Sequence, residues 1–176
     1  MFILQSIGFW FLLTSLCIKF VTPSVPTGQY FVLKNPHSGY VLDASQEWVT
    51  LQQFTGFTTQ HWRLEAATGG QFYIVNKFQG KVLDLDYRYP IKNSWVVVSN
   101  KIDDCKNECS PINMKTKASM NIGACQKWYV HYGGFIVNSC GKYAVEIRKD
   151  NYTAGVYLET WDLSEKDNQK FTFLYV

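Results

Sequence analysis

Three acidic residues recur at matching places in this chain and could accept hydrogen bonds from a ligand. Asp43, Asp84 and Glu146 each lie eight residues after an asparagine and follow a glycine-containing segment. A carboxylate accepts charge-assisted hydrogen bonds from hydroxyl groups, but a short acidic side chain at a turn also bonds backbone amides. Ligand binding and turn capping therefore both stay open for these residues.

A second mark closes each of three segments: a glutamine two residues before a large aromatic ring. The marks are Gln60-His61-Trp62, Gln126-Lys127-Trp128 and Gln169-Lys170-Phe171. We interpret the glutamines as mainly structural, holding a strand crossing while the ring packs. The rings are then equivalent core residues, and a second equivalent set is Leu42, Leu83 and Val145.

The elements that position these residues are three copies of one unit. Residues 33–43, 74–84 and 136–146 align without gaps, and each begins with an apolar, strand-like run. An asparagine follows (Asn35, Asn76, Asn138), and then a glycine (Gly39, Gly80, Gly141). This pattern predicts a β-hairpin in which the asparagine bonds nearby backbone amides and the glycine adopts positive φ.

Three such units of about four strands predict an all-β protein. A repeat unit cannot bury its apolar face alone, and closure around a pseudo-threefold axis leaves one shared core without open edges. We therefore expect a β-trefoil, with repeats at about 30–66, 71–131 and 134–176. The second repeat carries about twenty extra residues, which predict a cysteine-containing loop insertion held by disulfides.

Composition and charge exclude several function classes. The 176 residues are 47% hydrophobic, 16% aromatic and 18% charged, which excludes a disordered chain or a coiled coil. The net charge of +3 is spread along the chain without a basic stripe, so we expect no nucleic-acid partner. Isolated histidines and the lack of catalytic, metal or phosphate-binding motifs predict no enzyme activity, no cofactor and no metal.

The first 24 residues are interpreted as a secretory signal peptide, and residues 25–176 as the mature domain. The apolar run of residues 2–18 is short for a membrane span, and a small residue, Ser24, offers a cleavage site. A signal anchor or a buried helix are the alternatives. No later segment is long and apolar enough to cross a bilayer, so we expect a secreted, extracellular protein.

Export changes how the cysteines are interpreted. The mature chain keeps four of them, Cys105, Cys109, Cys125 and Cys140, which predict two disulfides of open connectivity. A zinc site is the weaker alternative, because no second pair of ligands follows Cys105 and Cys109. Asn151-Tyr152-Thr153 is an acceptor sequence for an N-linked glycan if the secretory route is eukaryotic.

Together, the hairpin mark Gly-x-x-Leu-Asp and the closing mark Gln-x-Trp resemble the ricin B-chain type lectin family, also called carbohydrate-binding module family 13. The third copy varies both marks, ending in Val-Glu and Gln-x-Phe. The resemblance covers about residues 30–176. It implies a non-catalytic β-trefoil that binds glycans or glycoproteins, often galactose-type, at up to three shallow sites.

The resemblance also implies roles for particular residues. In each repeat the acidic residue binds sugar hydroxyls, a ring on the next strand stacks on the sugar, and a polar residue before the glutamine completes the rim. The residues that match, or stand near these places, are Asp43, Gln60, Asp84, Glu146, Tyr157, Asn168 and Gln169. The stacking position is expected at Gln52, at Val98 or its neighbours, and at Glu159, so no repeat is complete.

Two function classes follow from this incomplete match. The first is a secreted glycan-binding module. The second is a trefoil whose sugar sites have degenerated and which recognises or inhibits a protein through the loop at 100–125. Retained acidic residues favour the first class, and lost stacking rings favour the second.

Overall fold

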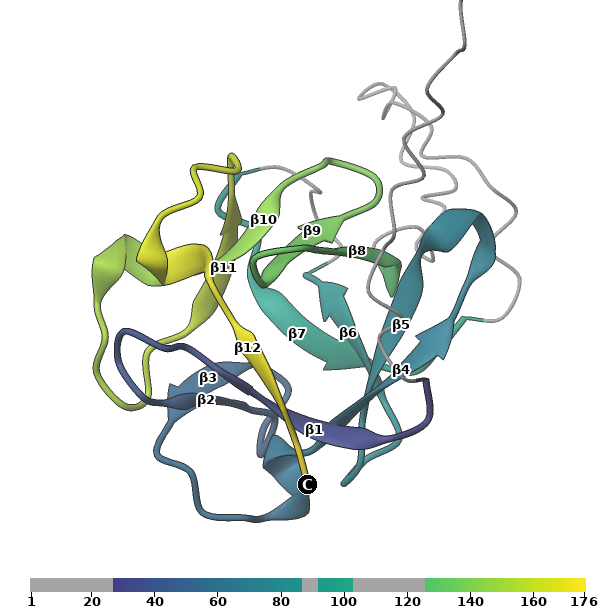
Figure 1. Ribbon diagram of the computed structural model, residues 1–176, viewed down its shortest axis with the longest axis horizontal. Helices are drawn as coiled ribbons and strands as arrows, with labels where there is room; N and C mark the ends of the chain where they lie inside the picture. Colours follow the sequence, from purple (N-terminus) through teal and green to yellow (C-terminus); the bar gives the residue numbers. More distant parts are fainter. Residues whose placement is uncertain (1–26, 87–91, 103–125) are drawn as a thin grey trace, which may run out of the picture.

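Figure 1 shows the computed structural model, which describes residues 27–86, 92–102 and 126–176. Twelve strands joined by turns and short 3₁₀ segments make up this part of the chain, and it contains no α-helix. The expected signal peptide and the cysteine-containing insertion, with Cys105, Cys109 and Cys125, lie outside the described residues. No described helix is long and apolar enough to cross a membrane.

The strands divide into a barrel and three hairpins, which is the β-trefoil that the repeats predicted. The barrel strands are β1 (Tyr30–Lys34), β4 (Trp62–Ala66), β5 (Phe72–Asn76), β8 (Trp128–His131), β9 (Phe135–Asn138) and β12 (Thr172–Tyr175). The hairpins pair β2 (Val41–Asp43) with β3 (Thr50–Gln52), β6 (Val82–Leu85) with β7 (Val96–Ser99), and β10 (Ala144–Ile147) with β11 (Leu158–Trp161). All pairs are antiparallel, and β1 lies beside β12 (Figure 1).

The conserved place of the asparagine in each repeat has a clear structural reason. Asn35 is fully buried; its Oδ1 accepts the Ser38 amide at 2.8 Å inside the turn. Its Nδ2 donates to the carbonyls of Asp167 and Lys170, in the closing turn of the third repeat. Asn76 binds the closing turn of the first repeat in the same way. Asn35 and Asn76 thus fix their own hairpins and clasp the preceding repeat, and Asn138 fixes its own turn by accepting the amides of Cys140 and Gly141.

The third hairpin departs from the predicted turn. Gly39 and Gly80 have φ of +76° and +66°, as expected, but Gly141 is not in the positive-φ region. Lys142 adopts it instead, at +56°, because the fourth residue after the asparagine takes this conformation in every repeat. The expectation for Gly141 was therefore wrong by one residue, and the non-glycine residue at this place is strained.

The shared core is built from the rings that close the repeats. Trp62 and Trp128 are fully buried and Phe171 is 1% exposed, and they join one cluster with the second set, Leu42, Leu83 and Val145. The indoles of Trp62 and Trp128 donate to the carbonyls of Leu42 and Leu83 at 3.3 and 3.0 Å. The two tryptophans therefore tie barrel to hairpin by packing and by hydrogen bonding.

The three hairpins meet around the pseudo-threefold axis. Isolated bridges join Trp48 to Val97, Trp95 to Glu159 and Thr50 to Tyr157. The rings of Trp48, Trp95 and Tyr157, one from each repeat, contact one another edge to face with centroids 5.7–6.2 Å apart. This aromatic triad holds the hairpins in fixed relative positions.

Candidate functional site

The glutamines of the closing marks play one structural role in all three repeats. Gln60 donates to the carbonyl of Gln53 and accepts the Thr55 amide, both at 2.8 Å. Gln126 and Gln169 bind the corresponding backbone groups after β7 and β11, at Asn100 and Ile102 and at Asp162 and Ser164. Each amide therefore fixes the chain where it leaves the hairpin, as the sequence predicted.

Strand register identifies the equivalent stacking positions in the three hairpins. Gln52 lies opposite Val41, two residues before the acidic Asp43. Ser99 lies opposite Val82, and Trp161 lies opposite Ala144, each again two residues before the acidic residue. Directly opposed residues share a face of the sheet, as do residues two apart on one strand. The stacking position is therefore Gln52, Ser99 and Trp161.

This register narrows one expectation from the sequence to a single residue and corrects another. In the second repeat the position belongs to Ser99, the neighbour of Val98, and in the third it belongs to Trp161 rather than Glu159. Tyr157 was expected near the third site but belongs to the aromatic triad. Counting back from the glutamine would have found Trp161, because eight residues separate Gln52 from Gln60 and Trp161 from Gln169.

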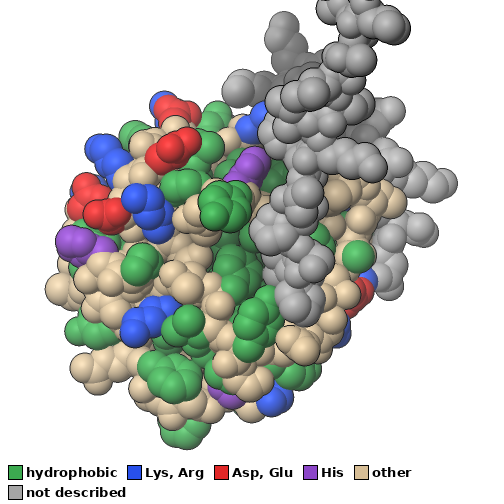
Figure 2. Space-filling view, in the orientation of Figure 1, with side chains coloured by type: hydrophobic (Ala, Val, Ile, Leu, Met, Phe, Trp, Pro, Cys, Tyr) green, Lys and Arg blue, Asp and Glu red, His purple; other side chains and the backbone are tan. Residues whose placement is uncertain are grey.

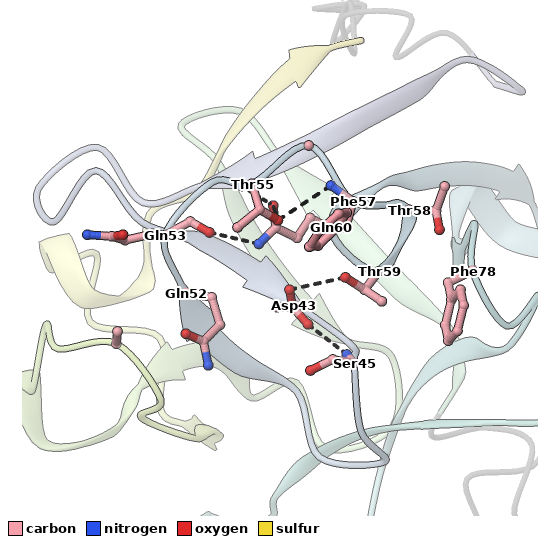
Figure 3. A pocket seen from close by; sticks show the side chains of 12 residues that line it. Asp43, Ser45, Gln52, Gln53, Thr55, Phe57, Thr58, Thr59, Gln60 and Phe78 are labelled. Atoms are coloured by element: carbon pink, nitrogen blue, oxygen red, sulfur yellow. Dashed lines mark hydrogen bonds between the residues drawn. The ribbon is translucent and has the colours of Figure 1, made fainter.

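The first repeat forms an open, shallow depression of about 690 Å³ around Asp43 (Figure 3). The Asp43 carboxylate accepts the Ser45 amide at 2.7 Å and the Thr59 hydroxyl at 3.2 Å. Thr59 thus replaces the usual asparagine of the rim and points its hydroxyl at the acid. Gln52 lies on one side of Asp43 and Phe78 on the other (Figure 3).

Two phenylalanines that line this depression were not predicted from the sequence. Phe57 and Phe78 line it with 69% and 59% of their surface exposed. Phe57 lies in the loop before the closing mark, and Phe78 lies in the next hairpin turn, which the Asn76 side chain holds. The repeat pattern gave no signal for them, because neither occupies a position that recurs in the other copies.

The acidic residue of the second hairpin mark, Asp84, is bonded within the protein. Asp84 is 3% exposed and accepts hydrogen bonds from the Leu85 amide, the Ser99 hydroxyl and the Gln126 amide. Burial raises the pKa of Asp84, while the bonds from Ser99, Gln126 and Leu85 lower it in part. Donors from its own chain fill this site. The polar residue of the rim is Cys125, which lies outside the described residues.

The third repeat combines an acid, a ring and a polar rim. Glu146 accepts one hydrogen bond, from Gln169 at 2.8 Å, and its other oxygen has no partner among the described residues. Burial, and secondly the neighbouring Glu159, raise the pKa of Glu146. Asn168, just before the glutamine, donates to the Ile147 carbonyl, and its Oδ1 is buried without a hydrogen-bond partner in the part of the chain that the structure describes.

The ring of this site is Trp161, which is 36% exposed. The ammonium group of Lys92 lies 5.2 Å from its ring centre and pairs with Asp162. Both Lys92 and Asp162 are largely exposed, so this cation can move away when another group covers the ring. Trp161 and Glu146 therefore lie on one face of the third hairpin, while the Asn168 side chain is buried and bonded to Ile147.

Glu159 has a different role from the one expected. It faces Glu146 across the hairpin and lies 3.4 Å from the Arg148 guanidinium, which also stacks on Trp95 at 4.5 Å. Burial raises the pKa of Glu159, and Arg148 lowers it in part. This carboxylate thus connects the third hairpin to the aromatic triad rather than presenting a platform to a ligand.

Other candidate chemistry finds little support in the described part of the chain. No group of three or more His, Cys, Asp or Glu side chains that could hold a metal occurs among these residues. Cys140 is disulfide-bonded, and its pairing falls outside the described residues. On the face in Figure 2, Lys and Arg side chains are scattered among acidic ones rather than gathered in one patch.

The chain matches one family model, and many solved structures are similar to it. A model of the ricin-type β-trefoil lectin domain-like family matches residues 18–93. A search of curated proteins finds no match.

Several solved structures share the fold at low identity. The designed threefold-symmetric protein ThreeFoil superposes with a TM-score of 0.69 at 20% identity, covering 84% of this chain and 99% of that one. The Rhizoctonia solani agglutinin gives 0.66 at 19%, covering 87% and 98%. The Macrolepiota procera ricin B-like lectin, solved with lactose, gives 0.63 at 17%, covering 85% and 96%. The resemblance to the ricin B-type lectins that the three repeats predicted is thus confirmed, and the chain has their β-trefoil fold.

Proposed function

We propose that this protein is a secreted carbohydrate-binding module, without catalytic activity of its own, that binds glycans chiefly at its third repeat. The observation that carries the proposal is the register of the third hairpin, which sets Trp161 and Glu146 on one face. An exposed ring beside a carboxylate with spare acceptor capacity is the combination that a sugar needs.

The chemistry of this site suits a pyranose. The indole of Trp161 offers a flat apolar face for the C–H groups of the sugar ring. The free oxygen of Glu146 can accept hydrogen bonds from hydroxyls. Gln169 positions Glu146 by donating to its other oxygen.

The first repeat supports a second, weaker site. Asp43 accepts two hydrogen bonds, whereas a carboxylate has about four lone-pair sites, so it can accept more from a ligand. Phe57 and Phe78 supply apolar surface, but the stacking position holds Gln52. Because single shallow sites bind weakly, two sites on one molecule would raise affinity for a multivalent glycan surface.

Protein recognition through the loop at 100–125 remains the second candidate. The site around Asp84 favours it, because three donors of the protein already bind this carboxylate. The solved lectin with lactose suggests galactose-type sugars as the first ligands to test.

A glycan array probed with the full chain and matched variants separates these functions. We expect Trp161→Ala to weaken binding at least about tenfold, or 1.4 kcal/mol. Asp43→Ala should cause a smaller loss. Tyr132→Ala removes an exposed ring (90%) in the β8–β9 turn and serves as the control that retains binding. An array without any bound glycan, or equal binding by Trp161→Ala, would favour protein recognition instead.

Export is a separate part of the proposal, supported by the apolar segment at 2–18 and by four cysteines in the remaining chain. Expression of the full chain in secretory cells tests it. We expect the protein in the medium with an N-terminus near residue 25, as read by mass spectrometry. Retention of the intact chain in the membrane fraction would indicate the signal anchor.

A further inference from the structure

We propose that Asn151 is an acceptor for an N-linked glycan, on the hairpin that carries the proposed sugar site. The inference rests on the export proposed above, since the modification occurs in the secretory route. Asn151-Tyr152-Thr153 is the single Asn-x-Ser/Thr sequence in the 176 residues. Sequence alone leaves its accessibility open, and the structure supplies that evidence.

The side chain of Asn151 is exposed and free to react. It follows the 3₁₀ segment Arg148–Asp150, and its own backbone is extended, with φ −87° and ψ 90°. The Thr153 hydroxyl donates to Asn151 Oδ1 at 2.8 Å. Nδ2, the atom that receives the glycan, has no hydrogen-bond partner among the described residues. Threonine thus orients the carboxamide while leaving its nitrogen open to solvent.

The loop around Asn151 is anchored on both sides. Tyr152 packs on the core, and its ring lies 4.4 Å from that of His37 in the first repeat. Further along, the Gly155 amide donates to the Leu51 carbonyl at 2.8 Å. Because these contacts do not involve the Asn151 side chain, a glycan can be attached there without disturbing the packing.

The oligosaccharide is transferred to Asn151 from a donor that the cell supplies. The Asn151 Nδ2 forms a bond to the anomeric carbon of an oligosaccharide carried on a lipid diphosphate. The bond from that carbon to the phosphate oxygen breaks, and its electron pair leaves with the lipid diphosphate. The amide nitrogen loses one proton to a base of the transferase, so the product is a neutral N-glycoside.

The place of Asn151 in the fold determines which parts of the protein a glycan there would lie near. Asn151 lies in the loop between β10 and β11, whose strands carry Glu146 and Trp161. Ala154 in the same loop lines the depression of the first repeat. A glycan on Asn151 would therefore stand near the depression of the first repeat, at the end of the third hairpin that lies away from Trp161.

The test is the mass of the full chain secreted from eukaryotic cells, before and after treatment with peptide N-glycosidase. One arm uses the chain's own N-terminus, and a second adds an established signal peptide in front of it. Four proteins are compared: wild type, Asn151→Gln, Thr153→Ala and Thr153→Ser, which keeps the hydroxyl. We expect one enzyme-sensitive glycan on wild type and Thr153→Ser and none on the other two.

The enzyme converts a glycosylated Asn to Asp, which should appear in the tryptic peptide that begins at Asp150. An unmodified wild type in the arm with the added signal would overturn the proposal, and so would an unchanged glycan on Asn151→Gln. A glycan found in that arm alone would support the acceptor site and contradict export by the chain's own N-terminus. The two failures are therefore distinguishable, and neither depends on the glycan array.

Discussion

The second and third repeats share one scaffold but treat their carboxylates in opposite ways. In the second, Ser99 and Gln126 donate hydrogen bonds to Asp84, which is buried. In the third, Trp161 occupies the position of Ser99, and Glu146 keeps an unpartnered oxygen. The residue at the end of the second hairpin strand is thus a hydrogen-bond donor to the acid in one repeat and an aromatic ring on the same face in the other.

The largest effect on stability should come from removing Gln126, which donates a hydrogen bond to Asp84 in the second repeat. Gln126→Ala leaves the buried Asp84 short of one hydrogen bond and frees backbone groups at Asn100 and Ile102. We expect a loss of about 2–4 kcal/mol in the free energy of unfolding, measured in urea. Gln60→Ala, whose glutamine bonds no carboxylate, should cost about half of that. Equal losses would contradict a structural role for Asp84.

A second test uses pH to ask whether the third acid binds ligand. Because burial and Glu159 raise the pKa of Glu146, this carboxylate gains its proton at a higher pH than an ordinary glutamate. Glycan binding should therefore weaken as pH falls through that raised pKa, by about tenfold, because a neutral acid accepts weaker hydrogen bonds. Isothermal titration at several pH values checks this. Glu146→Gln should bind weakly and without that pH dependence.

Installing the missing ring in the first repeat tests the stacking position directly. Gln52→Trp places an indole on the depression around Asp43, where Gln52 is half-buried. We expect about 0.5–1.5 kcal/mol of additional binding energy for a sugar. Thr172→Trp, at an exposed position of β12 that does not line the depression, is the control. A gain with both variants would indicate nonspecific adhesion of the added ring.

The smallest effect concerns the turn of the third hairpin and should leave binding unchanged. Lys142 is strained at φ +56°, so Lys142→Gly should raise the free energy of unfolding by about 0.5–1 kcal/mol. Gly80→Ala, at the equivalent place in the second repeat, should lower it by a similar amount. A changed glycan affinity in Lys142→Gly would show that turn and site are coupled.

The repeats could be predicted from the sequence because each recurring residue has the same structural role in every repeat. Asn35 and Asn76 must bond both their own turn and the preceding repeat, and Trp62 and Trp128 must fill the core. Fixed geometry keeps such residues at fixed intervals, so the hairpins, the core and the trefoil all followed from spacing.

The stacking position could not be found by counting from the acid, because hairpin loops differ in length. Gln52 follows Asp43 by nine residues, whereas Ser99 and Trp161 follow their acids by fifteen. Strand pairing determines which residues meet, and pairing depends on the whole loop. Likewise, Phe78 reaches the first site from the next repeat, a contact that only the folded chain creates.

The asparagine clasps have one more consequence. Since Asn35 holds the last closing turn as Asn76 holds the first, the first repeat is joined to both other repeats, and Tyr30 and Val176 meet at the seam between the first and third repeats through a 3.0 Å hydrogen bond. A short linker across this seam, with a fresh opening at an exposed bend of another hairpin, would give a circular permutant that retains each clasp. A chain that begins at a different one of the three repeats should therefore reach the same folded structure.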